Sequence, residues 1–202
     1  MELKKERGKM SANMLTKVGV LSAIAFVLML LEFPLWFAPP FLKMDLSEVP
    51  ALMGTFALGP VAGVLIQLIK NILNLAIDGT TTMAVGEFAN FVVGSIFVYT
   101  AGYIYHKDKN VKNAIVGMAV GTVAMTVAMA IANYYVMIPF YAKLFGMPLD
   151  KIVAMGSAVN RHVVDFKSLI LYAIVPFNLL KGLIVTLITF LLYKRVSPIL
   201  HR

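Results

Sequence analysis

The 202-residue chain contains no cysteine, and charged residues make up only 14% of it. Without cysteine the chain has no disulfide and no thiolate metal site. Soluble domains carry about 25% charged residues, so the low charge argues against a soluble protein. The phosphate-binding GxxxxGK(S/T), the zinc-hydrolase HExxH and the nucleophile-elbow GxSxG patterns are also missing. We therefore expect no ATP-binding loop, no metal site and no cofactor in this chain.

Histidine is scarce as well. The three histidines, His106, His162 and His201, all fall in predicted loops or tails. A histidine-based hydrolase acting within a membrane would need such side chains inside its apolar segments. The histidines therefore argue against a hydrolase or metal enzyme of this kind, and we predict that the chain is not an enzyme.

Apolar residues are what the chain has in abundance. They make up 60% of it, and the mean hydropathy is +0.84. A helix needs about 20 residues to cross a bilayer. The apolar segments predict one all-α domain over residues 1–202, a compact bundle of six transmembrane helices at about 14–31, 46–58, 60–77, 83–105, 113–138 and 170–193.

The distribution of basic residues predicts the orientation. The net charge of +8 is spread over tails and loops, which does not indicate a nucleic-acid partner. With six spans, eleven Lys and Arg side chains fall on the side of both tails and of loop 106–112, and five fall on the other side. Cytoplasmic loops are enriched in Lys and Arg, so both termini are predicted to be cytoplasmic in a multi-pass membrane protein.

The apolar run 170–193 contains three unexpected residues, Pro176, Asn178 and Lys181. Lys181 lies near the middle of the run, about 17 Å from either end at 1.5 Å per residue. A central Lys costs roughly 2.5–3.5 kcal/mol on insertion scales, and crossing a membrane does not require it. Asn178 shares a helix face with Lys181, and Pro176 favours a kink beside them. We interpret this face as one wall of a buried polar pocket.

Other predicted helices carry polar stripes at helical spacing. Such stripes usually face the interior of a bundle, and here they converge on a cavity open to the outside. Alternatively, the amides only join helices, Lys70 pairs with Glu87 or Asp78, and Glu87 is the counter-ion of Lys181. The stripe residues are Gln67, Lys70, Asn71 and Asn74; Glu87 and Asn90; and Thr122, Thr126 and Asn133.

Small residues recur four apart in two predicted helices. In 113–138, Gly117 and Gly121 favour close packing within the bundle. In 14–31, Gly19 and Ala23 fit either such packing or docking to another membrane protein.

Five longer stretches resemble a known family. They are FLKMD at 41–45, PALMGTFALGP at 50–60, LIKN at 68–71, GEFANF at 86–91 and PFNLLKG at 176–182. Together they resemble the substrate-binding S components of energy-coupling factor (ECF) transporters, and among these the riboflavin-binding members. The resemblance covers nearly the whole chain.

The resemblance implies a function, partners and a site. The chain would capture riboflavin from outside the cell as transported ligand. It would work with a membrane scaffold subunit, EcfT, and two cytosolic ATPase subunits that use ATP. Gly19 and Ala23 match the scaffold-docking surface of the family. By matching motif, the ligand contacts are Leu42, Met44, Asp45, Asn90, Asn133, Asn178 and Lys181, and the adjoining carboxylate of Glu87 completes the expected site.

Three alternatives remain open. The same scaffold would accept another vitamin or FMN, the phosphorylated flavin. A membrane enzyme would use Glu87 and Lys181 as acid and base. A structural assembly protein would need Asn178 and Lys181 for stability alone.

Overall fold

The computed structural model describes residues 11–200, and of these the side chains of 11–193. Several basic residues used to predict the orientation therefore lie outside the described residues: Lys4, Lys5, Arg7, Lys9 and Arg202. The side chains of Lys194 and Arg195 also lie outside the described part, as does His201.

The described chain is almost entirely helical, with one short hairpin. Its helices are α1 (Ala12–Leu30), α2 (Glu48–Leu58), α3 (Pro60–Ile77), α4 (Val85–Lys107), α5 (Val111–Ala132), α6 (Ile138–Leu144), α7 (Leu149–Ser157), α8 (Phe166–Leu169) and α9 (Val175–Leu200). Two π-helical turns are η1 (Asn133–Met137) and η2 (Ile170–Ile174). The strands β1 (Phe33–Pro34) and β2 (Lys43–Met44) pair antiparallel.

Within the described residues, five helical segments are long and apolar enough to cross a membrane. They are α1, α3, α4, the continuous Val111–Leu144 and the continuous Phe166–Tyr193. The sixth expected span, α2, has 11 residues, which reach about 16 Å, against a hydrocarbon core of about 30 Å. The expected end at residue 138 was too early, because η1 and α6 carry the helix on to Leu144. The structure is thus a helical membrane protein with five segments of spanning length.

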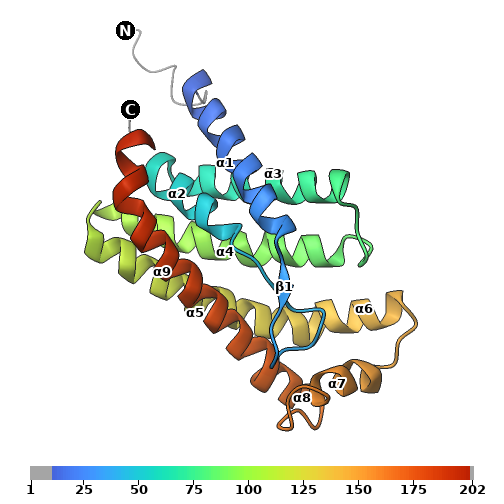
Figure 1. Ribbon diagram of the computed structural model, residues 1–202. Helices are drawn as coiled ribbons and strands as arrows, with labels where there is room; N and C mark the ends of the chain where they lie inside the picture. Colours follow the sequence, from blue (N-terminus) through green and yellow to red (C-terminus); the bar gives the residue numbers. More distant parts are fainter. Residues whose placement is uncertain (1–10, 201–202) are drawn as a thin grey trace, which may run out of the picture.

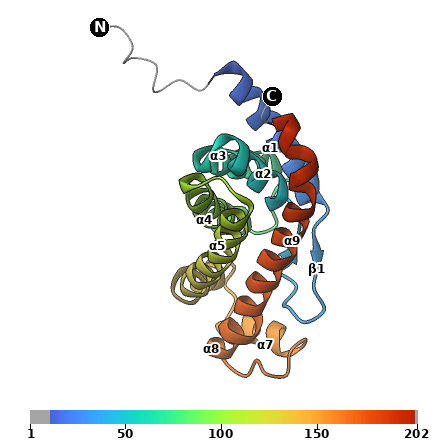
Figure 2. The same cartoon turned by 90° about the vertical axis from the view of Figure 1, so that its left-hand side faces the viewer.

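The helices place the two ends of the described chain together. The start of α1 and the end of α9 lie at one end of the molecule, and α7 and α8 lie at the other (Figure 1). The view turned by 90° shows the same arrangement (Figure 2). In both views the loop that contains the hairpin runs alongside α9. The loop packs on α9 through a cluster of Ala38, Met44 and Phe177.

Helix α2 is buried along nearly its whole length. Its residues from Glu48 to Phe56 are all buried, because α1, α3, α4 and α9 surround it. Ser47, directly before this helix, has helical backbone angles, and its side chain makes no cap bond. Instead, the Asp45 side chain accepts a hydrogen bond of 2.8 Å from the Ser47 N–H. Pro50 lies in the first turn.

Helices α4 and α5 approach each other closely at two glycines. A Cβ on Gly117 would lie 2.6 Å from the carbonyl oxygen of Ala101, and one on Gly121 would lie 2.9 Å from that of Phe97. Only glycine permits this separation of the two backbones. The packing interpretation of these small residues is confirmed.

Candidate ligand-binding site

The ammonium group of Lys181 lies between two carboxylates. Its Nζ donates to Asp45 Oδ2 at 3.0 Å and lies 3.2 Å from Glu48 Oε1. The Lys181 side chain is only 5% exposed. An ammonium has three N–H donors, so these two contacts leave one donor for a further partner.

A second buried lysine joins the same group. Lys70 Nζ on α3 lies 3.3 Å from Glu48 Oε1 and donates to the hydroxyl of Ser47. Its side chain is fully buried. The alternative partners considered for Lys70, Glu87 and Asp78, are therefore wrong.

Asp45 is ionised at this position. It lies outside the spanning helices, in the segment between β2 and α2. Burial by itself would raise the pKa of its carboxyl group. The ammonium groups of Lys181 and Lys70, and hydrogen bonds from Ser47, outweigh burial and bring the pKa well below its usual range. Asp45 therefore supplies a fixed negative charge beside Lys181.

Side chains of the first loop pack against α9 and hold the loop beside it. Met44 is 1% exposed and packs with Phe177, the residue before Asn178. Leu42 is half-buried and packs both on this cluster and on a second one, formed mainly by residues of α6, α7, α8 and η2. The loop thus brings Leu42, Met44 and Asp45 beside the helix that carries Asn178 and Lys181.

The two buried asparagines of the expected site make the same local bond. Asn178 Nδ2 donates to Ile174 O, and Asn133 Nδ2 donates to Met129 O, each at 2.8 Å. Asn133 is also the first residue of the π-helical turn η1. Wide turns of this kind are frequent at functional sites. Asn90 is half-buried, and its Oδ1 lies 3.5 Å from Asn71 Nδ2.

Glu87 does not belong to the charged group. It is half-buried in the first turn of α4, where Oε2 accepts hydrogen bonds from Thr80 at 3.1 Å and from Thr82 at 3.2 Å. The idea that Glu87 is the counter-ion of Lys181 is wrong, because Asp45 and Glu48 occupy that role.

Glu48 is the member of the group that sequence reasoning missed. It reads as an ordinary acidic residue in the first turn of a helix, where the helix dipole favours a negative charge. The signal that was available is its spacing: Asp45 and Glu48 are three apart, directly before an apolar helix.

Pro176 shapes the backbone beside the asparagine. Residue 176 would donate to Tyr172 O in a regular α-helix, but proline has no N–H. The side chain of Asn160 supplies the missing donor, with Nδ2 at 2.8 Å from Tyr172 O.

At the start of the same helical segment, Asp165 caps α8. Hydrogen bonds from Ser168 lower the pKa of the Asp165 carboxyl group.

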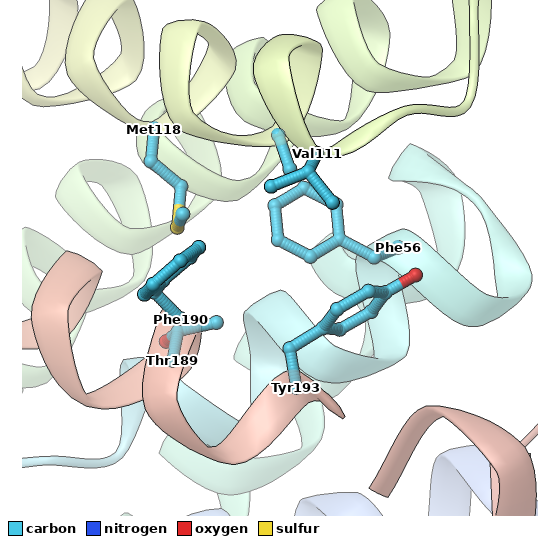
Figure 3. A pocket seen from close by; sticks show the side chains of 7 residues that line it. Phe56, Val111, Met118, Thr189, Phe190 and Tyr193 are labelled. Carbon is cyan, nitrogen blue, oxygen red and sulfur yellow. The ribbon is translucent and has the colours of Figure 1, made fainter. Parts of the chain in front are cut away.

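Two hollows lie away from these residues. A surface groove of about 420 Å³ runs beside α7 and α8, lined by Leu149, Asp150, Val153, Ala154, Ser157, Val164, Asp165 and Phe166. A small apolar cavity of about 20 Å³ lies at the other end, where Phe56, Met118 and Tyr193 point toward one another (Figure 3). Neither hollow is lined by an expected site residue.

The two candidate docking residues lie on the outer face of α1. Gly19 and Ala23 are exposed, and a Cβ on Gly19 would meet nothing within 4 Å. Packing within the described part of the chain therefore does not account for this small-residue pair.

The fold and the site define a class of protein. Over residues 13–193 the chain matches the family described as ECF transporter, substrate-specific component, and it belongs to this family. The resemblance noted from the sequence is confirmed. Since the members of this family are transporter components, the membrane-enzyme alternative is not favoured.

Individual relatives are similar over nearly their whole length. The chain is 38% identical over 188 residues to "Riboflavin transporter RibU" of Staphylococcus aureus (strain TCH60), covering 93% of this chain and 92% of that protein. It is 35% identical to "Riboflavin transporter FmnP" of Bacillus subtilis (strain 168), covering 94% of each. A solved structure titled "Structure and mechanism of the S component of a bacterial ECF transporter" matches with a TM-score of 0.73 and 38% identity, covering 94% of this chain and 98% of that one.

Proposed function

We propose that this chain is the subunit of an ECF-type uptake transporter that captures riboflavin. The observation that carries the proposal is the buried contact of Asp45 with Lys181, which seats the first loop on α9 next to Asn178. The names of the relatives, both riboflavin transporters, support the choice of ligand.

The chemistry of the residues suits a flavin. The isoalloxazine ring has flat apolar faces and one edge of carbonyls and ring nitrogens. Leu42 and Met44 offer apolar surface, and the Lys181 ammonium and the Asn178 amide offer hydrogen bonds to the polar edge. Asn90 and Asn133 complete the proposed set, with Asp45 covering the ligand from the loop. Glu87, in the first turn of α4, accepts hydrogen bonds from Thr80 and Thr82, so we place it at the border of the site.

The proposed orientation puts the loop and α7 outside the cell. Both ends of the chain are then cytoplasmic, in the cell membrane of a prokaryote, and α2 counts as a sixth, shorter membrane helix. The basic residues of the tails and of loop 106–112 support this orientation. Riboflavin then enters from the end of the molecule where α7 and α8 lie.

The proposed partners are the scaffold subunit EcfT and two cytosolic ATPases. Family membership supports an ATP-driven assembly, and the chain has no phosphate-binding loop of its own. The exposed small-residue face at Gly19 and Ala23 is where we place the scaffold.

The test is ligand binding by the purified protein in detergent. We expect riboflavin fluorescence to be quenched on titration, and we expect mass spectrometry to find riboflavin in protein purified from cells. A thermal-shift panel of riboflavin, FMN and other vitamins distinguishes the flavin from the alternatives. Stabilisation by another vitamin and not by riboflavin would refute the proposed ligand.

A further inference from the structure

The charges buried around Lys181 form a balanced group of four. Asp45 and Glu48 are acidic, and Lys70 and Lys181 are basic. Their side chains are at most 5% exposed. The formal charge of the group is zero, so each of its members is compensated only while the others are present.

Glu48 is the bridge of this group. Its Oε1 lies 3.2 Å from Lys181 Nζ and 3.3 Å from Lys70 Nζ, so one oxygen serves both ammonium groups. Its other oxygen, Oε2, is buried without a hydrogen-bond partner in the described part of the chain. Lys70 also donates a hydrogen bond to the hydroxyl of Ser47.

We infer that Lys70 and Glu48 are a positioning pair for Lys181, a role that rests on the proposed riboflavin site. Without Lys70, the whole charge of Glu48 falls on Lys181 and draws its ammonium away from a neutral guest. Without Glu48, Lys70 is uncompensated and repels Lys181 through a medium of low dielectric constant. Affinity for riboflavin therefore depends on the charge balance of the pair.

The inference makes a prediction that a purely structural role does not. If the pair only stabilised the fold, each single variant would have a lower Tm, because one member of a buried ion pair is left uncompensated, but folded protein would bind riboflavin with unchanged affinity. If the pair acts through charge, removing both members leaves the neutral contact of Asp45 with Lys181, and binding returns.

The experiment compares Lys70→Met, Glu48→Gln and the double variant by quenching of riboflavin fluorescence, at a temperature at which thermal unfolding shows each variant to be folded. Lys143→Met, at an exposed position on α6, is the control for loss of a lysine. We expect each single variant to bind at least tenfold more weakly than the unmodified protein. We expect the double variant to bind within threefold of it, and the control to bind unchanged.

The outcomes separate this inference from the proposed function. Single variants that bind normally, or a double variant as weak as the weaker single one, would overturn the inference alone. Where one single variant does not fold, the other one decides: folded protein that binds at least tenfold more weakly supports the pair, and folded protein that binds normally overturns it. Failure of the folded double variant to bind also overturns the inference. Absence of riboflavin binding by the unmodified protein would overturn the proposed function and this inference together.

Discussion

Asn160 donates from its side chain to the backbone carbonyl of Tyr172 at 2.8 Å, replacing the N–H that Pro176 lacks. Pro176 is two residues before Asn178, so the bond stabilises the backbone at the proposed site. An unpaired backbone group is costly near a bilayer, where water is scarce.

Asn160→Asp tests this bond directly. The aspartate keeps the Oδ1 that accepts from His162 N–H but loses the donor to Tyr172. Loss of a hydrogen bond costs about 1 kcal/mol, or a Tm lower by about 2–4 °C in a chain of this size. We expect that decrease in thermal unfolding in detergent. A Tm equal to that of the unmodified protein would show that the Tyr172 bond contributes nothing.

The same substitution in two helices should have opposite effects. Gly117→Ala places a Cβ 2.6 Å from a backbone oxygen of α4, and we expect a loss of about 1–3 kcal/mol. Gly19→Ala meets nothing within 4 Å, and alanine favours a helix by about 0.5–1 kcal/mol over glycine. Thermal unfolding of the two variants checks the close approach of α4 and α5. Equal Tm values would contradict it.

Larger side chains on the outer face of α1 should separate binding from transport. We expect Gly19→Leu and Ala23→Leu to bind riboflavin normally, because both positions are exposed. Uptake into cells and co-purification with the scaffold subunit should fall. Val123→Leu, 56% exposed on α5, is the control. Normal uptake by both α1 variants would dismiss this face as the docking surface.

The sequence was most informative where a polar or charged residue lies within an apolar segment. A lysine at the centre of an apolar run predicted a buried polar contact, and Lys181 has one. Its partners were not predictable from helix spacing, because Asp45 lies 136 residues away and approaches from a loop. Glu48 escaped notice because a first-turn acid usually needs no other explanation.

The π-helical turns were also beyond sequence reasoning. Proline at 176 indicated an irregular helix, but the widened turn lies before it, at Ile170–Ile174. The sequence does not show which backbone carbonyl lacks its helical donor. It also does not show that Asn160 donates to this carbonyl, because that contact depends on the fold of the chain around α7. Such long-range compensation has no local signature.

The central claim is that Lys181 contacts the ligand as well as its carboxylates. Lys181→Met alone is ambiguous, because it leaves a buried negative charge unpaired, which costs about 3–5 kcal/mol. In the double variant Asp45→Asn and Lys181→Met, the remaining pair of Glu48 and Lys70 is neutral, and we expect much of the stability to return.

The decisive measurement is therefore riboflavin affinity of the folded Asp45→Asn, Lys181→Met double variant, with Tm as the measure of folding. We predict that the Tm of the double variant lies closer to that of the unmodified protein than the Tm of Lys181→Met does. We also predict that its affinity for riboflavin is still more than tenfold weaker than that of the unmodified protein. Affinity restored to that of the unmodified protein would show that Lys181 only neutralises its neighbours and does not hold the flavin.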